Sequence, residues 1–90
     1  MSTAPELRLD KWLWHARFVR QRALAVDLVS RRRVRVNDQL VAKTHQRVRP
    51  GDVITMAHNQ GVRVVRVVHL GLRRGTAEEA QNLYEPIVVD

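Results

Sequence analysis

Positively charged side chains are the largest group of chemically functional residues in this 90-residue sequence, and they are clustered. Between positions 8 and 49 twelve basic residues stand against three acidic ones, so this segment has a formal charge of 12 − 3 = +9. The whole chain has 16 Lys and Arg against 9 Asp and Glu, or +7. Arginine guanidinium groups bind phosphate oxygens through paired hydrogen bonds. The clustering therefore predicts a polyanionic partner, a nucleic acid or an acidic lipid surface, and favours a nucleic acid.

Residues that would support catalysis or metal binding are few and dispersed. The sequence has no cysteine, its histidines stand at positions 15, 45, 58 and 69, and no glycine-rich loop suited to a phosphate is present. A chain of this length forms one domain and has little wall with which to enclose a substrate cleft. We therefore predict a protein that is not an enzyme and has no cofactor or metal, with each histidine at the surface or in the core.

Composition also bears on location. A chain without cysteine fits a reducing compartment. No apolar run approaches the ~20 residues of a membrane span, and residues 1–7 lack the charged start and apolar core of a signal peptide. We therefore expect a cytoplasmic protein that does not associate with membranes.

Two helices are expected to position part of the cationic cluster. Apolar residues at helical spacing predict a helix from Leu9 to Val19, with Asp10 near its positive end. A second apolar stripe predicts a helix from Arg22 to Ser30, packed on the first as a hairpin. The outer face of the first helix is expected to carry Asp10, Lys11, Trp14, Arg17 and Phe18.

Short strands follow the helices. Alternation at Val34 and Val36, followed by Asn37-Asp38, predicts a strand and a tight hairpin turn. A short returning segment spans positions 39–44, Pro50-Gly51 marks another turn before a strand at 52–56, and the β-branched run at 62–70 predicts the longest strand. Arg63 and Arg66 are three residues apart, so we expect a bulge near Val65 or an edge position there.

The C-terminal part predicts one more helix. Thr76-Ala77-Glu78-Glu79 fits a capping box, and we expect a helix over about 77–85 that Pro86 ends. We divide the chain into a frayed N-terminus (1–7), one domain (8–85) and a tail (86–90).

The basic hairpin offers candidate contacts for a phosphate backbone. These are Lys11, Arg17, Arg20, Arg22 and Arg31. Arg17 could instead pair with Asp10. Trp14 could stack on unpaired bases or pack in the core, and we favour the core for Phe18. We expect the paired helices and the arginines after them to form one continuous cationic surface.

The ordered motifs over positions 8–85 resemble a known family. Arg8-Leu9-Asp10-Lys11-Trp12-Leu13, Ala16-Arg17-Phe18, Val34-Arg35-Val36-Asn37 and Gly51-Asp52-Val53-Ile54 resemble the S4 RNA-binding domain. Arg73-Arg74, Glu79-Ala80 and Leu83-Tyr84-Glu85 are similar to the C-terminal signature of the fifteen-kilodalton heat-shock protein family. The resemblance implies an α+β fold, in which a helical hairpin packs on a small curved antiparallel sheet.

The resemblance also implies a partner and a role. The expected partner is structured RNA, foremost ribosomal RNA of the large subunit and with transfer RNA as a further candidate. Apart from the resemblance, we expect the protein to be a monomer. The expected role is stress-related quality control, in which obstructed large subunits that still carry a nascent chain are rescued or recycled. The resemblance gives as RNA-facing residues Arg8, Lys11, Arg17, Arg22 and Lys43, and charge alone adds Arg20, Arg31 and Arg33.

Several positions depart from the family pattern. Arg32 and Asp38 stand where the family usually has glycine, Gln21 replaces a capping Ser or Thr, and Gly75 stands where Pro is common. A non-glycine residue in left-handed backbone costs on the order of 1 kcal/mol. Arg32 was therefore either accepted for an additional phosphate contact or fixed by drift.

Two other interpretations remain open at this stage. A DNA-binding helix-turn-helix would use the same two helices, but no third helix follows and strands begin after Arg33. A domain cut from a pseudouridine synthase or a tRNA synthetase would need a longer chain, and the ending at 87–90 does not look like an entry into one.

Overall fold

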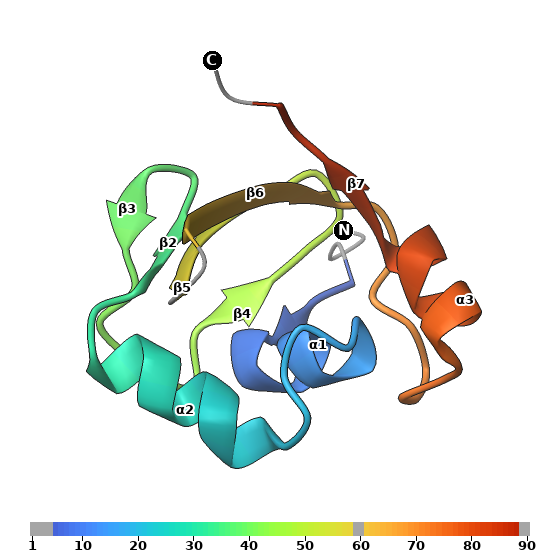
Figure 1. Cartoon of the computed structure of the whole chain (residues 1–90), viewed down its shortest axis with the longest axis horizontal. Helices are drawn as coiled ribbons and strands as arrows, with labels where there is room; N and C mark the ends of the chain where they lie inside the picture. Colours follow the sequence, from blue (N-terminus) through green and yellow to red (C-terminus); the bar gives the residue numbers. More distant parts are fainter. Residues whose placement is uncertain (1–4, 59–60, 89–90) are drawn as a thin grey trace.

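The computed structural model describes residues 5–58 and 61–88 and has an α+β architecture (Figure 1). The helices are α1 (Leu9–His15), α2 (Arg22–Ser30), α3 (Ala77–Ala80) and the 3-10 helix η1 (Gln81–Leu83). The strands are β1 (Leu7–Arg8), β2 (Val34–Val36), β3 (Gln39–Leu40), β4 (Arg47–Val48), β5 (Val53–His58), β6 (Gly61–Val67) and β7 (Tyr84–Pro86).

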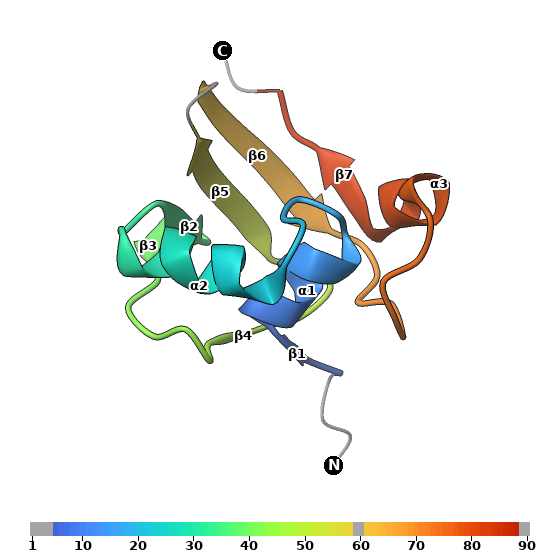
Figure 2. The same cartoon turned by 60° about the horizontal axis from the view of Figure 1, so that its bottom comes forward.

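The strands form two antiparallel sheets. A five-stranded sheet has the order β3-β2-β5-β6-β7, and β1 pairs with β4 in a separate two-stranded sheet. The helices α1 and α2 contact each other and lie on one side of the five-stranded sheet, while α3 lies beside β7 (Figures 1 and 2). This is the predicted helical hairpin on an antiparallel sheet.

The core lies between the helical hairpin and the sheet. Alternate residues of the strands point toward the helices, because successive side chains of a strand point to opposite faces. Trp12 is fully buried there and its Nε1–H donates to the carbonyl oxygen of His69 over 2.9 Å. The buried sheet residues are Val34, Val36, Ile54, Met56, Val65 and Val67, and the buried helix residues include Leu9, Leu13, Ala25 and Val29.

The first helix is shorter than predicted. It ends at His15 rather than Val19, because Arg17 has a φ of +63° and turns the chain. The N–H of Phe18 donates to the carbonyl of Leu13 (3.0 Å) and that of Arg17 to the carbonyl of Trp14 (3.1 Å). These two bonds are the Schellman pattern, which usually has glycine at the left-handed position.

The second helix matches its predicted bounds and ends in the same pattern. The N–H of Arg33 donates to the carbonyl of Leu28, and that of Arg32 to the carbonyl of Val29, both over 3.0 Å. Arg32 has a φ of +60°, so it occupies the left-handed position that its place in the sequence predicts. Gln21 precedes the helix and makes no side-chain capping bond.

The hairpin turn of the sheet is also as predicted. Asn37 and Asp38 have φ values of +51° and +68°, which is the conformation of a two-residue hairpin turn. The side chain of Asn37 extends this turn toward β5, because its Oδ1 accepts from the Val53 N–H over 2.9 Å. Asp38 therefore adopts left-handed backbone without glycine.

The expected bulge near Val65 is wrong. Strands β5 and β6 pair without interruption from Val53↔Arg66 to His58↔Gly61, and β6 lies between β5 and β7 rather than at an edge. Arg63 and Arg66 simply point to opposite faces of a regular strand. The strand also ends at Val67, three residues before the predicted end.

The expected helix over 77–85 is also wrong in its second half. The N-cap half of the capping box forms, since the Thr76 Oγ1 accepts from the Glu79 N–H over 3.1 Å, while the Glu79 carboxylate pairs with Arg73. The α-helix stops at Ala80, and Tyr84 to Pro86 form strand β7. Pro86 thus belongs to a strand instead of ending a helix, and an edge strand can hold a proline because one of its sides needs no donor.

Candidate nucleic-acid interface

A buried carboxylate organises the start of the helical hairpin. The side chain of Asp10 is only 4% exposed, so the expectation that it lies on the outer face of the helix is wrong. Its two oxygens accept from the Nε and an NH2 group of Arg8, each over 3.1 Å, and one accepts from Arg22 over 3.3 Å. The Lys11 backbone N–H donates to the same carboxylate over 2.9 Å. Asp10 therefore holds α1 and α2 together at their N-terminal ends.

This arrangement does not neutralise the arginines that it fixes. Arg8 and Arg22 supply two positive charges against one carboxylate, so the three groups keep a net charge of +1. Both arginine side chains are 43% exposed, whereas the acid lies beneath them. A guanidinium has five N–H donors, so each retains donors that can face a phosphate. The structure thus presents two oriented guanidinium groups at one place.

The other cations of the hairpin are held differently. Lys11 is half-buried and Arg20 is exposed, and neither forms an ion pair within the described residues. Arg17 does not pair with Asp10. Its Nε donates to the carbonyl oxygen of Gly75 over 2.8 Å, which ties the turn after α1 to the segment before α3.

The two predicted aromatic residues have different surroundings. Phe18 packs against the core, as favoured from the sequence, although it is only half-buried. Trp14 is half-buried as well, and the Arg74 guanidinium carbon lies 5.7 Å from its ring centroid. A cation over one ring face is an attractive contact. The Trp14 ring is therefore partly covered by a cation that the sequence analysis did not select.

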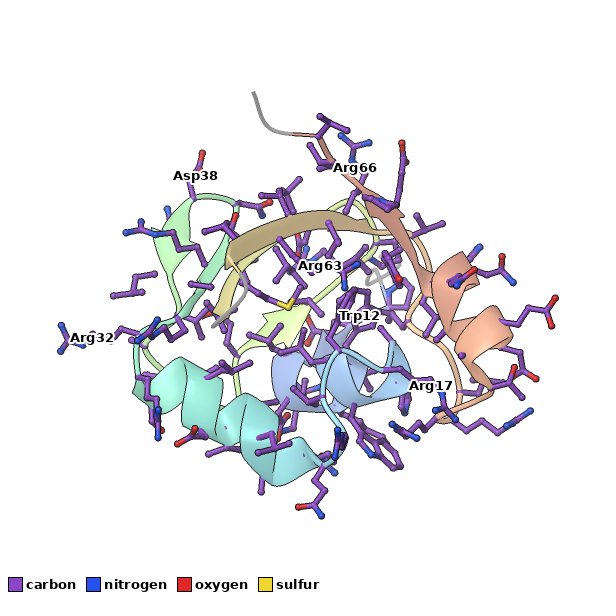
Figure 3. All side chains as sticks on the ribbon, viewed as in Figure 1. Trp12, Arg17, Arg32, Asp38, Arg63 and Arg66 are labelled. Carbon is purple, nitrogen blue, oxygen red and sulfur yellow. The ribbon has the colours of Figure 1, made fainter. Side chains whose placement is uncertain are left out.

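A second group of arginines lies at the far end of α2. Arg31 forms an i,i+4 ion pair with Asp27 at 3.2 Å, and both side chains are more than half exposed. Arg22 and Arg31 are nine residues apart, which at 100° per residue places them on opposite faces and about 13 Å apart along the axis. Arg32 projects away from the body of the molecule (Figure 3). The single continuous cationic surface expected from the sequence is therefore divided into two groups.

The remaining predicted residues are exposed. Arg33 lies between α2 and β2, and Lys43 lies between β3 and β4. Neither has a carboxylate within 4.0 Å among the residues that the structure describes. Both are therefore available to an anion, but Arg33 belongs to the group at the C-terminal end of α2.

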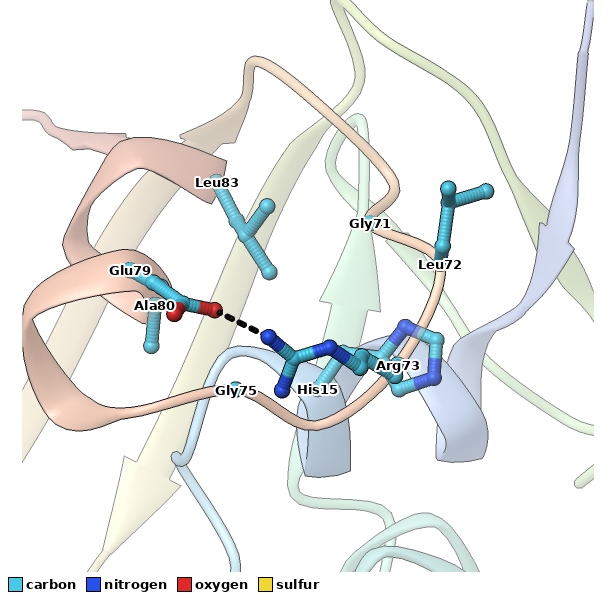
Figure 4. Close-up of a pocket in the computed structure, with 8 residues that line it drawn as sticks. All are labelled: His15, Gly71, Leu72, Arg73, Gly75, Glu79, Ala80 and Leu83. Carbon is cyan, nitrogen blue, oxygen red and sulfur yellow. Dashed lines mark hydrogen bonds and ion pairs between the residues drawn. The ribbon is translucent and has the colours of Figure 1, made fainter.

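No histidine stands in a chemically active arrangement in the described part of the chain. His15 is buried, and its Nδ1 lies 3.1 Å from the carbonyl oxygen of Leu70. It lines a small pocket of about 210 Å³, in which Arg73 pairs with Glu79 at 3.3 Å (Figure 4). His45 and His69 are exposed, and the side chain of His58 lies outside the described residues. Within 5–58 and 61–88, no three His, Asp or Glu side chains group as metal ligands would.

The described helices are also too short or too polar to cross a bilayer.

Sequence reasoning missed three members of this region. Asp10 was placed at the surface, although a carboxylate beside so many arginines could have suggested an organising role. Arg63 was assigned to a bulge, but a regular β-strand period would have placed it on the same face as the core residues of β6. Arg74 belongs to the C-terminal signature, but its contact with Trp14 was not predictable because the two residues are sixty positions apart.

Comparison with known proteins places this geometry in a family. The family model of the S4 domain matches residues 7–54, which contain the helices α1 and α2 and the strands β1 to β4. A heat shock protein 15 homolog of Aeromonas salmonicida is 41% identical over 84 residues, covering 93% of this chain and 63% of that protein. Heat shock protein 15 of Escherichia coli is 39% identical over 82 residues, covering 91% and 61%. The chain thus spans about three fifths of the length of these relatives.

Two further relatives match over most of their own length. The Bacillus subtilis protein named RQC P-site tRNA stabilizing factor is 35% identical over 80 residues, covering 87% of this chain and 88% of that protein. A solved structure of heat shock protein 15 of Vibrio cholerae, described as trimeric, superposes with a TM-score of 0.85 at 37% identity. It covers 92% of this chain and 83% of that one. This chain therefore belongs to the S4 domain family and is a relative of the heat shock protein 15 proteins.

Proposed function

We propose that this chain binds structured RNA through the N-terminal ends of α1 and α2. The observation that carries the proposal is the pair of half-exposed arginines, Arg8 and Arg22, fixed on the buried carboxylate of Asp10. Fixed guanidinium groups lose little conformational entropy when they bind phosphates, because their rotamers are already set. Lys11 in the first turn of α1 and Arg20 in the loop before α2 add positive charge to the hairpin, and we include Arg17 in the turn after α1.

Structured RNA fits this surface better than duplex DNA. Double-stranded RNA is recognised mainly by shape and by contacts to phosphates and 2′-hydroxyls. A helix-turn-helix protein instead inserts a recognition helix into the major groove of DNA. In this chain α2 begins at Arg22, which is held by Asp10, and three residues separate the end of α2 from β2.

The RNA is proposed to be ribosomal RNA of the large subunit, with transfer RNA as a second ligand. The names of the relatives support this choice, since one is a P-site tRNA stabilizing factor and others are heat shock proteins. We propose a non-enzymatic role, in the cytoplasm, in the rescue or recycling of obstructed large subunits that carry a nascent chain. We propose a monomer as the unit that binds. A sedimentation-equilibrium run at the concentrations used for binding would contradict this if it gave a trimer.

The salt dependence of binding tests the electrostatic part of the proposal. If about six phosphates are contacted, log affinity should fall against log salt with a slope of about −4 to −6. Lys11→Ala should flatten the slope by about one unit with little change in melting temperature. Lys11 is a better choice than Arg22, because removing Arg22 would also leave Asp10 short of a partner. Arg66→Ala, on the opposite face of the sheet, is the matched control and should leave the slope unchanged. A flat salt profile for the unmodified protein would refute the proposal.

Sedimentation of cell lysate through a sucrose gradient tests the biological partner. The protein should migrate with free large ribosomal subunits, and its share there should rise after translation is blocked. The Lys11→Ala variant should be depleted from these fractions. Recovery with chromosomal fragments instead would support the DNA-binding alternative and overturn the ribosomal one.

A further inference from the structure

Arg63 occupies an unusual place for a charged side chain. In the β5–β6 register it is paired with Met56, which is fully buried, and it lies on the same face of β6 as the core residues Val65 and Val67. It therefore points to the face of the sheet that the helical hairpin covers; Figure 3 labels it. The residue is nevertheless exposed, because it lies beyond the edge of the core.

The guanidinium of Arg63 rests on an aromatic ring. The guanidinium carbon, Cζ, lies 4.9 Å from the ring centroid of Phe18. That ring is itself held by two others, since its centroid lies 4.6 Å from that of Tyr84 and 5.9 Å from that of Trp12. Phe18 is thus fixed by the core on its inner sides and carries the arginine on its open side.

Arg63 also differs from the other arginine of the same strand. Arg66 points to the opposite face and pairs with Glu85 of β7 at 3.5 Å. Arg63 has no carboxylate within 4.0 Å among residues 5–58 and 61–88. No carboxylate of the described residues therefore compensates its charge, and the residue is exposed, so a ligand can reach the guanidinium.

The position adjoins the cationic hairpin. Phe18 lies in the turn between α1 and α2, with Arg17 before it and Arg20 two residues after it. A nucleic acid whose phosphates lie along the hairpin would bring its bases near this ring. Arginine guanidinium planes and aromatic rings are the groups on which proteins stack unpaired RNA bases, and every base offers a π-face for this contact.

We propose that Arg63 and Phe18 form a stacking site for one unpaired RNA base, with the guanidinium lying between the ring and the base. This rests on the proposed RNA-binding function and deepens it, because it predicts preference for RNA that contains a loop or bulge. The planar group is the essential element. A lysine at the same position would keep the charge but lose the flat surface.

The test compares two RNAs of equal phosphate number, a perfect duplex and a stem-loop with 2-aminopurine at an unpaired position. The unmodified protein should bind the stem-loop more tightly and quench the 2-aminopurine fluorescence. Arg63→Lys should weaken stem-loop binding about fivefold or more and abolish the quenching, while duplex affinity stays within twofold. The duplex affinity shows that the variant is folded. Arg66→Lys is the matched control and should change neither affinity.

Each outcome separates this inference from the function on which it rests. If the unmodified protein binds neither RNA, the proposed function fails. If it binds both RNAs equally without quenching, or if Arg63→Lys weakens both by the same factor, the stacking site is refuted and RNA binding stands. If Arg63→Lys weakens stem-loop binding and abolishes the quenching while duplex affinity is kept, the stacking site is established.

Discussion

Replacing Asp10 by asparagine tests the central feature of the interface. The carboxylate is 4% exposed and accepts three hydrogen bonds from guanidinium groups and one from a backbone N–H. Asparagine has nearly the same size but keeps a single acceptor oxygen and has no charge. Arg8 and Arg22 would then face each other without the anion that holds them. We therefore expect Asp10→Asn to destabilise the fold and to free both arginine side chains.

The expected loss in the free energy of unfolding follows from the burial of the Asp10 carboxylate and the partial exposure of its arginine partners. Hydrogen bonds to charged groups contribute roughly 1.5–3 kcal/mol each when they are buried. The arginine ends are 43% exposed, so solvent screening reduces the electrostatic part. We expect a loss of about 2 kcal/mol in the free energy of unfolding. In a domain of this length, that loss lowers the melting temperature by roughly 8–16 °C.

Thermal unfolding followed by circular dichroism measures this loss. The matched control is Asp27→Asn, which removes a surface partner of Arg31 and should cost less than about 0.5 kcal/mol. RNA binding, measured well below both melting temperatures, supplies a second readout. Asp10→Asn raises the net charge from +7 to 16 − 8 = +8, yet its affinity should fall because the arginines are no longer oriented. Equal small effects of both variants on stability, with tighter RNA binding by Asp10→Asn, would refute the reasoning.

Three further substitutions test local features. Arg32→Gly should raise the free energy of unfolding by about 0.5–1 kcal/mol in urea titrations, because glycine relieves the left-handed strain at some entropic cost. A simultaneous loss of RNA affinity would show that Arg32 contacts a phosphate, whereas unchanged affinity would indicate drift. Thr76→Ala should cost about 1 kcal/mol through loss of the bond to the Glu79 N–H, and Thr76→Ser should restore it. Trp12→Phe should cost about 1–3 kcal/mol in thermal unfolding, since the His69 carbonyl loses its buried donor; an unchanged midpoint would contradict this.

Elements with short-range causes were predictable from the sequence. Helix α2 has its predicted bounds, because its apolar stripe and its end lie within one local segment. The Asn37-Asp38 turn formed as predicted, since these residue types tolerate left-handed backbone. The cap at Thr76 likewise depends only on a neighbour three residues away.

Local sequence patterns did not predict where α1 and α3 end, because contacts with distant segments decide both ends. The apolar spacing continues to Val19, but Arg17 turns left-handed and its side chain bonds to Gly75 in a different part of the chain. Helical signals continue past Ala80, but the backbone of Tyr84 is taken up by pairing with Val67 of β6. Helix propensity contributes less than about 1 kcal/mol per residue. The long-range hydrogen bonds of sheet pairing therefore outweigh it.

The sequence by itself determined that the chain is strongly basic, that its positive charge is concentrated in the first half, and that a pair of helices lies within this basic half. The tertiary structure alone decided which cations act together. Asp10 meets Arg22 only after α1 and α2 pack, and Arg63 meets Phe18 only when β6 crosses the turn between the helices. The physical reason is that charge is a property of each residue, whereas orientation and burial depend on neighbours that folding brings together.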